Sequence, residues 1–349
     1  MMSQEQELRR WSNFVSIWHT PVPEIGGTPR AAIWKKNKAT LWHYPAVKRK
    51  YAVPLFLVYS LVNQPYILDL APGSSMIESY VQNGFDVYLL DFGIPGYEDK
   101  DITLTDYIIG YIQKGVRRAL RHSGAEEMTV IGYCLGGTLA AIYTAIAEEP
   151  IRNLILSVTP LDFSIVPVLD NWVAALKEED APIKEFLELY GILPARMMEA
   201  SMRVVTSPVY VSPYLSLLAR GYDDAYVARW RRFNQWTKDH IPFAGAALLQ
   251  TIQDFGRDNK LINGGLVIGG KPVHLASIRA NLLVITSSND RLVPPEQSRP
   301  IMDMAASLDK TFRVNTGGHV MFTANGGLPE DLAEWLPERS KPVRSEGKR

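Results

Sequence analysis

The chain has 349 residues, of which 46% are hydrophobic and 21% are charged, and this composition excludes a disordered tail protein, a collagen-like repeat and a coiled coil. Lys and Arg together number 37, as do Asp and Glu, so the formal net charge is zero. The balance gives no indication of a nucleic-acid partner or of a cation store. The length fits one large domain or two ordinary ones, and the lack of net repulsion favours self-association, for example as a homodimer.

The N-terminal region predicts a short helix and a linker. Residues 3–18 place apolar side chains near one helical face, namely Leu8, Trp11, Val15 and Trp18. Residues 21–29 are rich in Pro and Gly, which is typical of a connection. The first residues contain no signal-peptide core, no apolar stretch is long enough to span a bilayer, and the single cysteine cannot form an intramolecular disulfide. These features predict a cytoplasmic protein without a transmembrane segment.

Apolar strands alternate with helices in the first half of the chain. The strands are predicted at residues 55–60, 86–91, 128–133 and 154–159. Helices are predicted over residues 103–121 and from residue 135 to residue 148. Uninterrupted apolar strands that alternate with helices indicate an α/β fold, with a mostly parallel sheet covered by helices on both faces.

The alternation stops at residue 162 and resumes after residue 256. The segment between them is rich in Trp, Tyr, Met and Pro and predicts an inserted, mainly helical cap. The pattern then predicts strands at 281–287 and 311–315, with helices from about residue 295 and over 329–339. The predicted organisation is a helix and linker (1–27), a first part of the core (28–161), the cap (162–256), a second part of the core (257–340) and a flexible tail (341–349).

The strongest motif is Gly-Tyr-Cys-Leu-Gly at residues 132–136, between a predicted strand and a predicted helix. It fits the nucleophile elbow of α/β-hydrolases, with Cys134 in place of the usual serine. Glycine on either side lets the backbone turn sharply and admits a substrate, and the helix N-terminus favours a thiolate. The alternative interpretation is a buried structural cysteine in an ordinary glycine-rich turn. The predicted strand before the motif and the predicted helix after it favour the nucleophile instead.

A nucleophile of this kind needs a base and an acid that orients the base. In α/β-hydrolases the acid and then the histidine follow the nucleophile in chain order, each after a late strand. Asp290 follows the strand at 281–287, and His319 follows the strand at 311–315. Alone, Asp290 would be interpreted as a turn residue and His319 as a capping or surface histidine. The ordered trio favours a catalytic triad.

Other residues are candidates for contacts with the substrate. The backbone N–H groups of Leu135 and Val62 are expected to form the oxyanion hole. Asn63 and His240 are weaker candidates for substrate binding, and Asn63 is equally compatible with a simple connection. The aromatic residues Tyr222, Tyr226, Trp230, Phe233 and Trp236 fit a helix core or the wall of an acyl tunnel. No metal-ligand spacing and no phosphate or dinucleotide fingerprint is present, so neither a metal nor a cofactor is expected.

Several segments carry a family resemblance. They are VYSLVNQPYILDLAPGSSMIESYVQNGFDVYLLDFGIPG, GYCLGG, IPFAGAA with DFGRDNKLINGGL, and TGGHV. They resemble polyhydroxyalkanoate synthases over residues 28–338, and the short length together with AAIWKKNKATLWHY is most similar to the two-subunit class IV type of bacilli, which is related to class III. The resemblance implies an α/β-hydrolase-fold acyltransferase that polymerises (R)-3-hydroxyacyl-CoA, with 3-hydroxybutyryl-CoA as the expected substrate, and releases CoA.

The resemblance also implies roles and partners. Cys134 matches the acylated nucleophile, His319 the base and Asp290 the acid, while Val62 and Leu135 match the oxyanion-hole positions. A small non-catalytic subunit, the growing polyester chain and the granule surface are the implied partners, and CoA enters only as part of the substrate. Two positions depart from the family pattern: Phe92 stands where Trp is usual, and Arg291 follows Asp290 where His is common.

Two other functions are compatible with the same residues. One is a thioesterase or lactone hydrolase with a cysteine triad, and the other is a non-catalytic granule-coating protein with a relic site. Water access separates the enzymes, because a dry, capped pocket favours transfer to a hydroxyl and an open one favours hydrolysis. The intact set of Cys134, Asp290 and His319 argues against a relic site.

Overall fold

The computed structural model describes residues 3–17, 19–165, 181–206, 212–320 and 328–343. Trp18 of the predicted N-terminal helix lies outside these residues. So do parts of the predicted cap and most of the predicted tail.

A sheet of eight strands forms the centre of the described residues, in the order β1-β2-β4-β3-β5-β6-β11-β12. The strands are β1 (Ala31–Lys36), β2 (Ala39–Tyr44), β3 (Leu55–Val58), β4 (Val87–Asp91), β5 (Met128–Tyr133), β6 (Ile151–Ser157), β11 (Asn281–Ser287) and β12 (Lys310–Asn315). The strands from β4 to β12 in this order pair in parallel, whereas β1, β2 and β4 pair antiparallel. The predicted mostly parallel sheet is confirmed.

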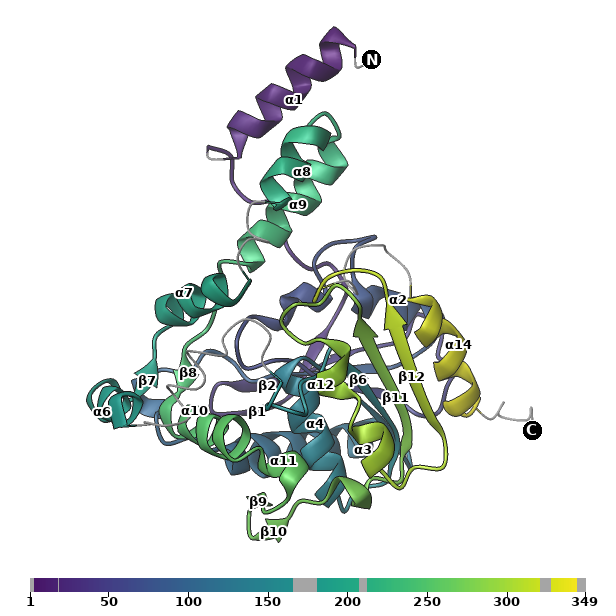
Figure 1. The fold of residues 1–349 in the computed structure, drawn as a ribbon. Coiled ribbons are helices and arrows are strands. Elements are labelled where there is room, and N and C mark those ends of the chain that lie inside the picture. Colours follow the sequence, from purple (N-terminus) through teal and green to yellow (C-terminus); the bar gives the residue numbers. More distant parts are fainter. Residues whose placement is uncertain (1–2, 18, 166–180, 207–211, 321–327, 344–349) are drawn as a thin grey trace, which may run out of the picture.

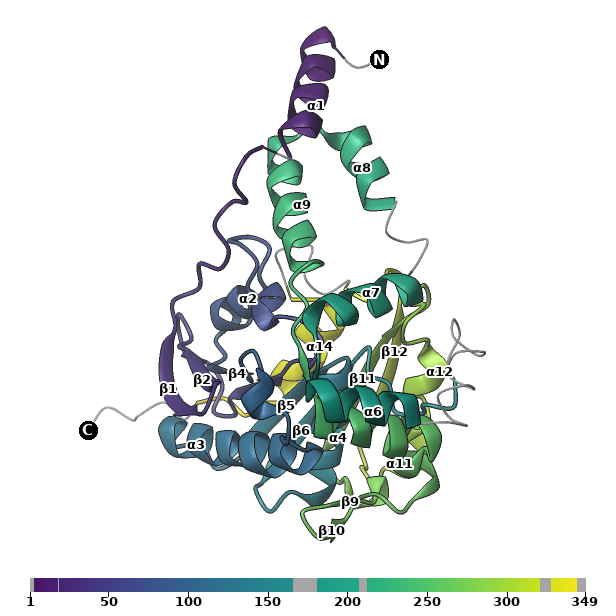
Figure 2. The same ribbon diagram turned by 90° about the vertical axis from the view of Figure 1, so that its left-hand side faces the viewer.

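Alternate residues of the central strands face two separate cores. In β3, Leu55 and Leu57 pack with α2 (Met76–Asn83) and α14 (Glu330–Arg339). Phe56 of the same strand packs on the other face, against α4 (Leu135–Ile146) and the helical residues 106–123. Because successive side chains of a strand point to opposite faces, a fully apolar strand requires helices on both sides. Figures 1 and 2 show the sheet inside the body with helices around it.

The predicted helix over 103–121 is present as two joined pieces. Residues Asp106–Gln113 form a π-helix (η3), and Lys114–Ser123 form α3, which ends at Gly124 in the left-handed conformation. α4 (Leu135–Ile146) follows β5 directly. The remaining helices of the body are η1 (Pro65–Leu68), η2 (Tyr97–Asp99), α11 (Lys260–Asn263), η5 (Leu275–Ser277), α12 (Pro295–Ser298) and α13 (Ile301–Met304).

The hairpin of β1 and β2 was not predicted from the sequence. Its turn lies at Asn37, which has a φ of 51°, a conformation that asparagine tolerates better than most residues. An irregular register between Ala32 and Trp34 breaks the apolar alternation that identifies strands. β1 also lies at the sheet edge and has no fully buried residue. An edge strand with a bulge therefore carries a weak sequence signal.

The stretch of sequence that connects β6 to β11 is mainly helical, and these two strands are neighbours in the sheet. The described elements there, in addition to α11 and η5, are α6 (Ala181–Tyr190), β7 (Ile192–Leu193), α7 (Ala195–Thr206), α8 (Ser212–Arg220), α9 (Asp224–Trp236), β8 (Phe243–Ala244), α10 (Gly245–Gln250), the π-helix η4 (Thr251–Arg257), β9 (Val267–Ile268) and β10 (Lys271–Pro272). An insertion at one place between adjacent strands fits the predicted cap, whose boundaries remain a prediction.

The predicted N-terminal helix is present as α1 (Gln4–Ser16), with Ser3 as its N-cap. α1 lies against α8 and α9 and projects with them from the body (Figures 1 and 2). Phe14 and Ile17 pack against the buried Leu217 and Trp230. The apolar residues named above, Leu8, Trp11 and Val15, are exposed by 68%, 50% and 54%. Their face of α1 is therefore not the one that contacts the cap.

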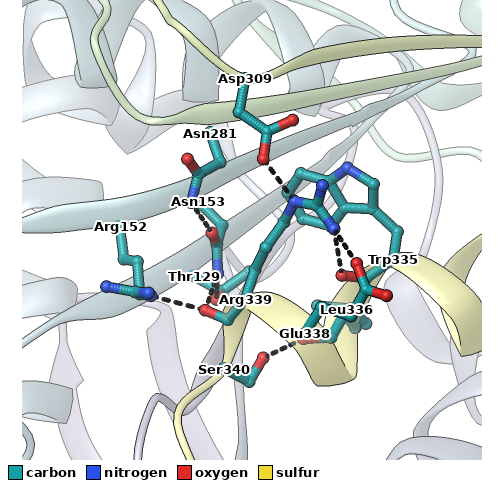
Figure 3. A network of polar contacts seen from close by, with 10 residues as sticks. All are labelled: Thr129, Arg152, Asn153, Asn281, Asp309, Trp335, Leu336, Glu338, Arg339 and Ser340. Carbon is teal, nitrogen blue, oxygen red and sulfur yellow. Dashed lines mark hydrogen bonds and ion pairs between the residues drawn. The ribbon is translucent and has the colours of Figure 1, made fainter.

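Buried polar groups join the start of the central strands to the end of α14 (Figure 3). Asn153 is fully buried, and its Nδ2 donates to Thr129 Oγ1 at 2.8 Å and to the Arg339 carbonyl at 3.2 Å. Its Oδ1 accepts from Asn281 Nδ2 at 2.9 Å. Arg152 Nε also donates to the Arg339 carbonyl, at 2.6 Å, so an unpaired carbonyl at the helix end is satisfied twice.

We expect Asn153→Ala to lower the free energy of unfolding by about 2 kcal/mol, because the partners of the amide would stay buried without a replacement. Urea unfolding followed by circular dichroism measures this change. The matched control is Asn263→Ala, which removes an exposed amide whose one bond among the described residues is to the Asp258 carbonyl and which should cost less than about 0.5 kcal/mol. Equal losses in the two variants would contradict the assigned role of the network.

Candidate active site

Cys134 lies at the sharp turn between β5 and α4, as the elbow motif predicts. Its φ is 52° and its ψ is −129°, which is a strained conformation for a residue with a side chain. Its N–H donates to the Ser157 carbonyl of β6 at 3.0 Å, and its carbonyl accepts from Gly137 N–H at 2.8 Å. These bonds hold the backbone in the strained turn, and the Cys134 side chain remains partly exposed.

Three glycines allow the surrounding elements to approach the turn. A Cβ at Gly132 would lie 2.3 Å from the Gly137 Cα, and one at Gly136 would lie 2.5 Å from the Val58 carbonyl oxygen. A Cβ at Gly137 would lie 1.9 Å from Thr159 Oγ1. All three distances are too short for any other residue, so the glycines are required for α4 to begin close to β3, β5 and β6.

Asp290 and His319 come together in space from two loops. Asp290 follows β11, and its side chain is completely buried, while that of His319 is 22% exposed. His319 Nδ1 lies 2.7 Å from Asp290 Oδ2. The other carboxylate oxygen accepts the N–H groups of Leu292 and Val293, both at 2.9 Å. The carboxylate is therefore fixed by the backbone on one side and orients the imidazole on the other.

Besides Asp290, the Cys134 side chain acts on the His319 ring. Burial disfavours the charged ring, but attraction to Cys134 and the hydrogen bonds to Asp290 and Cys134 outweigh it and raise the pKa of His319 to about 10. Since Nδ1 faces Asp290, the Nε2 atom is left for the sulfur. The structure thus brings the three predicted residues together in the order thiol, imidazole and carboxylate.

The predicted oxyanion-hole groups lie at the start of α4 and in the loop after β3. Leu135 is the first residue of α4, where a backbone N–H has no partner within the helix. The Val62 N–H points at Ser60 Oγ at 3.3 Å, a long contact. Gly136 packs against the carbonyls of Val58 and Tyr59, which brings the loop after β3 beside the start of α4.

Asn63 and His240 lie next to each other across an isolated antiparallel bridge. Asn63 Nδ2 donates to the Trp236 carbonyl at 3.1 Å, and its Oδ1 accepts from the Gln64 N–H at 2.7 Å. Both ends of this amide have protein partners, so its described contacts are structural, and a contact of Asn63 with substrate stays a prediction. Burial lowers the pKa of His240, and its buried Nδ1 has no hydrogen-bond partner among the described residues.

Metal-binding clusters and membrane-spanning helices were sought among the described residues. They contain no group of three or more His, Cys, Asp or Glu side chains arranged to hold a metal ion. Within the same part of the chain, every helix is too short or too polar to cross a membrane.

Comparison with known proteins gives one consistent result. A family model described as alpha/beta hydrolase fold matches residues 67–325. The chain is 31% identical to the poly(3-hydroxyalkanoate) polymerase subunit PhaC of Allochromatium vinosum, over 90% of both chains. It is 34% identical to the PhaC subunit of Haloarcula marismortui, over 91% of this chain and 69% of the relative.

The chain belongs to the poly(3-hydroxyalkanoate) polymerase family. Another PhaC subunit, from Haloferax mediterranei, is 33% identical over 91% of this chain, which spans only 65% of that relative. The three relatives are named as subunits of the polymerase. The family resemblance and the α/β-hydrolase fold expected from the sequence are confirmed.

Solved structures confirm the fold of this polymerase-family chain but not its chemistry. A soluble variant of monoglyceride lipase from Saccharomyces cerevisiae matches with a TM-score of 0.53 and 12% identity, over 92% of this chain and 100% of the lipase. A thermophilic esterase from Thermogutta terrifontis matches with a TM-score of 0.52 and 14% identity, over 90% of this chain and 100% of the esterase.

The protonated form of His319 should stabilise this polymerase-family chain in a pH-dependent way. Because its folded-state pKa of about 10 lies above the ordinary value of 6.5, this contribution is complete below about pH 6.5 and disappears as the pH rises towards 10. We expect the stability difference between the native chain and His319→Gln to be larger at about pH 6 than at about pH 9.5. Urea unfolding at both pH values measures it.

The control for this measurement is the same comparison in a Cys134→Ala background. Attraction to the Cys134 side chain contributes to the raised pKa of His319, so removal of the sulfur should weaken the pH dependence of the stability difference. A stability difference that grows with pH in the native background would contradict the raised pKa of His319.

Sequence reasoning missed several contacts around the site, although it named Trp236 as a residue of a helix core or a tunnel wall. Ser60 accepts the Val62 N–H. Trp236 and Asp239 bond the same loop from the predicted cap. The two bonds from the cap join residues that are 172 and 173 positions apart, so no short motif indicates them.

Proposed function

We propose that this chain polymerises (R)-3-hydroxyacyl-CoA, with 3-hydroxybutyryl-CoA as substrate, and releases CoA through a thioester on Cys134. One observation carries the proposal: a cysteine occupies the elbow beside the His319–Asp290 pair in a chain that belongs to a polymerase family. A thiol suits thioester exchange because sulfur is exchanged for sulfur and little proton transfer is needed.

Acylation is the first proposed step. His319 holds the proton of the thiol before the attack, as its raised pKa favours, and the Cys134 thiolate attacks the thioester carbonyl carbon of the substrate. The bond from that carbon to the CoA sulfur breaks, and the departing thiolate takes the proton from His319. The developing oxyanion is stabilised by the N–H groups of Leu135 and Val62, the latter exchanging its contact with Ser60 for the substrate oxygen.

Elongation is the second proposed step. The 3-hydroxyl of another hydroxyacyl-CoA attacks the acyl carbon on Cys134 and gives its proton to His319. The carbon–sulfur bond to Cys134 breaks, an ester bond forms, and His319 returns the proton to the thiolate. The lengthened acyl-CoA then acylates Cys134 again and releases one CoA for each unit added. Asp290 keeps the imidazole in the tautomer that accepts this proton.

The remaining contacts of the site are also proposals. His240 has a buried, unpartnered nitrogen beside the oxyanion loop, which supports a role in contacting substrate. No cofactor beyond the CoA of the substrate is proposed. The naming of the relatives as subunits supports a small non-catalytic partner, and the polymer product supports a cytoplasmic location at the granule surface.

The deciding experiment supplies 3-hydroxybutyryl-CoA and measures both CoA release and the product. Release of CoA with polymer, recovered by solvent extraction and size analysis, supports the proposal. Release with free 3-hydroxybutyrate alone would identify a thioesterase instead. No release in the presence or absence of a partner subunit would overturn the enzymatic assignment.

A further inference from the structure

The loop after β3 carries Val62 and is not supported by the sheet. β3 ends at Val58, so the following residues have no strand neighbours. The N–H of Ile241 donates to the Val62 carbonyl at 3.2 Å. Asn63 pairs with His240 in an isolated bridge. Its side-chain amide donates to the carbonyl of Trp236 at the end of α9, 173 residues away in sequence. The segment that follows α9 therefore serves as the missing strand neighbour for the loop.

Two side-chain bonds complete this connection. Trp236 Nε1 donates to the Gln64 carbonyl at 2.8 Å. The Tyr66 hydroxyl donates to Asp239 Oδ2 at 2.6 Å, a short bond to a charged acceptor. Trp236 is 8% exposed and belongs to the core under α2 and α14. The end of α9 is thus fixed in the body, and the loop is fixed to it.

We propose that Tyr66, Asp239 and Trp236 are positioning residues that hold the Val62 N–H in place for the oxyanion of the transition state. The inference rests on the oxyanion role of Val62 in the proposed function. It assigns a catalytic contribution to the C-terminal end of α9. This helix lies in the predicted cap, and its N-terminal end reaches α1 and α8 (Figures 1 and 2).

The physical reason is that a backbone donor stabilises an oxyanion only when it is held in advance at the right point. The Val62 N–H has one weak contact of its own, at 3.3 Å to Ser60 Oγ. Its position is therefore set by the neighbours of the loop. A mutation far from the chemistry that displaces such a group by about 1 Å can lower the reaction rate about 10²-fold.

The test uses p-nitrophenyl butyrate as acyl donor and follows the burst of p-nitrophenol as Cys134 is acylated. Tyr66→Phe removes only the hydroxyl that bonds Asp239, and Trp236→Phe removes the donor to Gln64 together with part of the buried indole ring. We expect each to lower the maximal burst rate about tenfold with less than a twofold change in the substrate concentration at half-maximum. Asp239→Asn keeps an acceptor and should stay within about threefold of the native rate.

A second measurement separates positioning from general damage to the site. Alkylation of Cys134 by iodoacetamide builds no oxyanion, so its rate should be native in Tyr66→Phe and Trp236→Phe. The matched control is Tyr214→Phe on α8, which removes a hydroxyl that donates to Asn234 of α9 at 3.4 Å without touching the loop. Its burst and alkylation rates should both be native.

The outcomes are distinct. Native burst rates in Tyr66→Phe and Trp236→Phe overturn the inference, as does a parallel loss of burst and alkylation, which would indicate a displaced triad. A loss confined to the half-maximal substrate concentration also overturns it. If 3-hydroxybutyryl-CoA releases no CoA but the p-nitrophenyl burst still depends on Tyr66 and Trp236, the proposed polymerase function fails and the inference stands. Absence of any burst in the native chain overturns the inference, whereas the proposed function is decided by CoA release from 3-hydroxybutyryl-CoA.

Discussion

Cys134→Ala should reduce CoA release from 3-hydroxybutyryl-CoA by at least about 10³-fold, because removal of the covalent nucleophile leaves only binding and oxyanion stabilisation. The fold should remain, since the side chain is partly exposed and the turn is held by backbone bonds to Ser157 and Gly137. Thiol-reactive detection of CoA measures the rate, and circular dichroism confirms the fold. Intact-mass spectrometry should find no acyl group on the variant.

Cys134→Ser provides the matched comparison. A hydroxyl must lose its proton fully to His319 as it attacks, so this variant should acylate far more slowly than the native thiol. Because Cys134 is the single cysteine of the chain, iodoacetamide labelling reports on this residue alone and should vanish in both variants. Substantial CoA release by a folded Cys134→Ala chain would show that another group accepts the acyl chain.

The parts of the fold that positioned the site were predictable because their signals are local. β5, the glycine-rich turn and α4 follow one another within residues 128–146, and each has its own pattern. Asp290 and His319 each follow a strand that was predicted to within one residue at either end. In a parallel sheet those strand ends share one edge, so chain order alone indicated that the side chains would meet.

The rest of the site depends on contacts that no short pattern encodes. The tie between Tyr66 and Asp239 joins residues that are 173 positions apart. The β1–β2 hairpin escaped prediction because its edge strand is bulged and only partly buried. The residues 3–18 pattern predicted a helix correctly but not which face of it would pack, because that depends on the position of α8 and α9.

Asp290→Asn should separate the two halves of the proposed reaction. The asparagine oxygen can still accept the N–H groups of Leu292 and Val293, so the loop should keep its shape. The amide nitrogen would then face His319 Nδ1 and force the tautomer whose Nε2 carries a hydrogen, and that nitrogen cannot accept a proton. We expect Cys134 to be acylated, since a thiolate at a helix N-terminus needs little proton transfer, but elongation to fall by about 10³- to 10⁴-fold.

Intact-mass spectrometry after mixing with 3-hydroxybutyryl-CoA distinguishes the steps. The variant should carry one or a few units on Cys134, whereas the native chain should carry long chains or release polymer. Asp303→Asn, the same change at an exposed site on α13, should elongate normally. If Asp290→Asn is not acylated at all, Asp290 is needed for the first step as well, because His319 then has to be oriented before the thiolate can form. If it elongates like the native chain, the hydrogen bond between Asp290 and His319 has no catalytic role and the triad assignment fails.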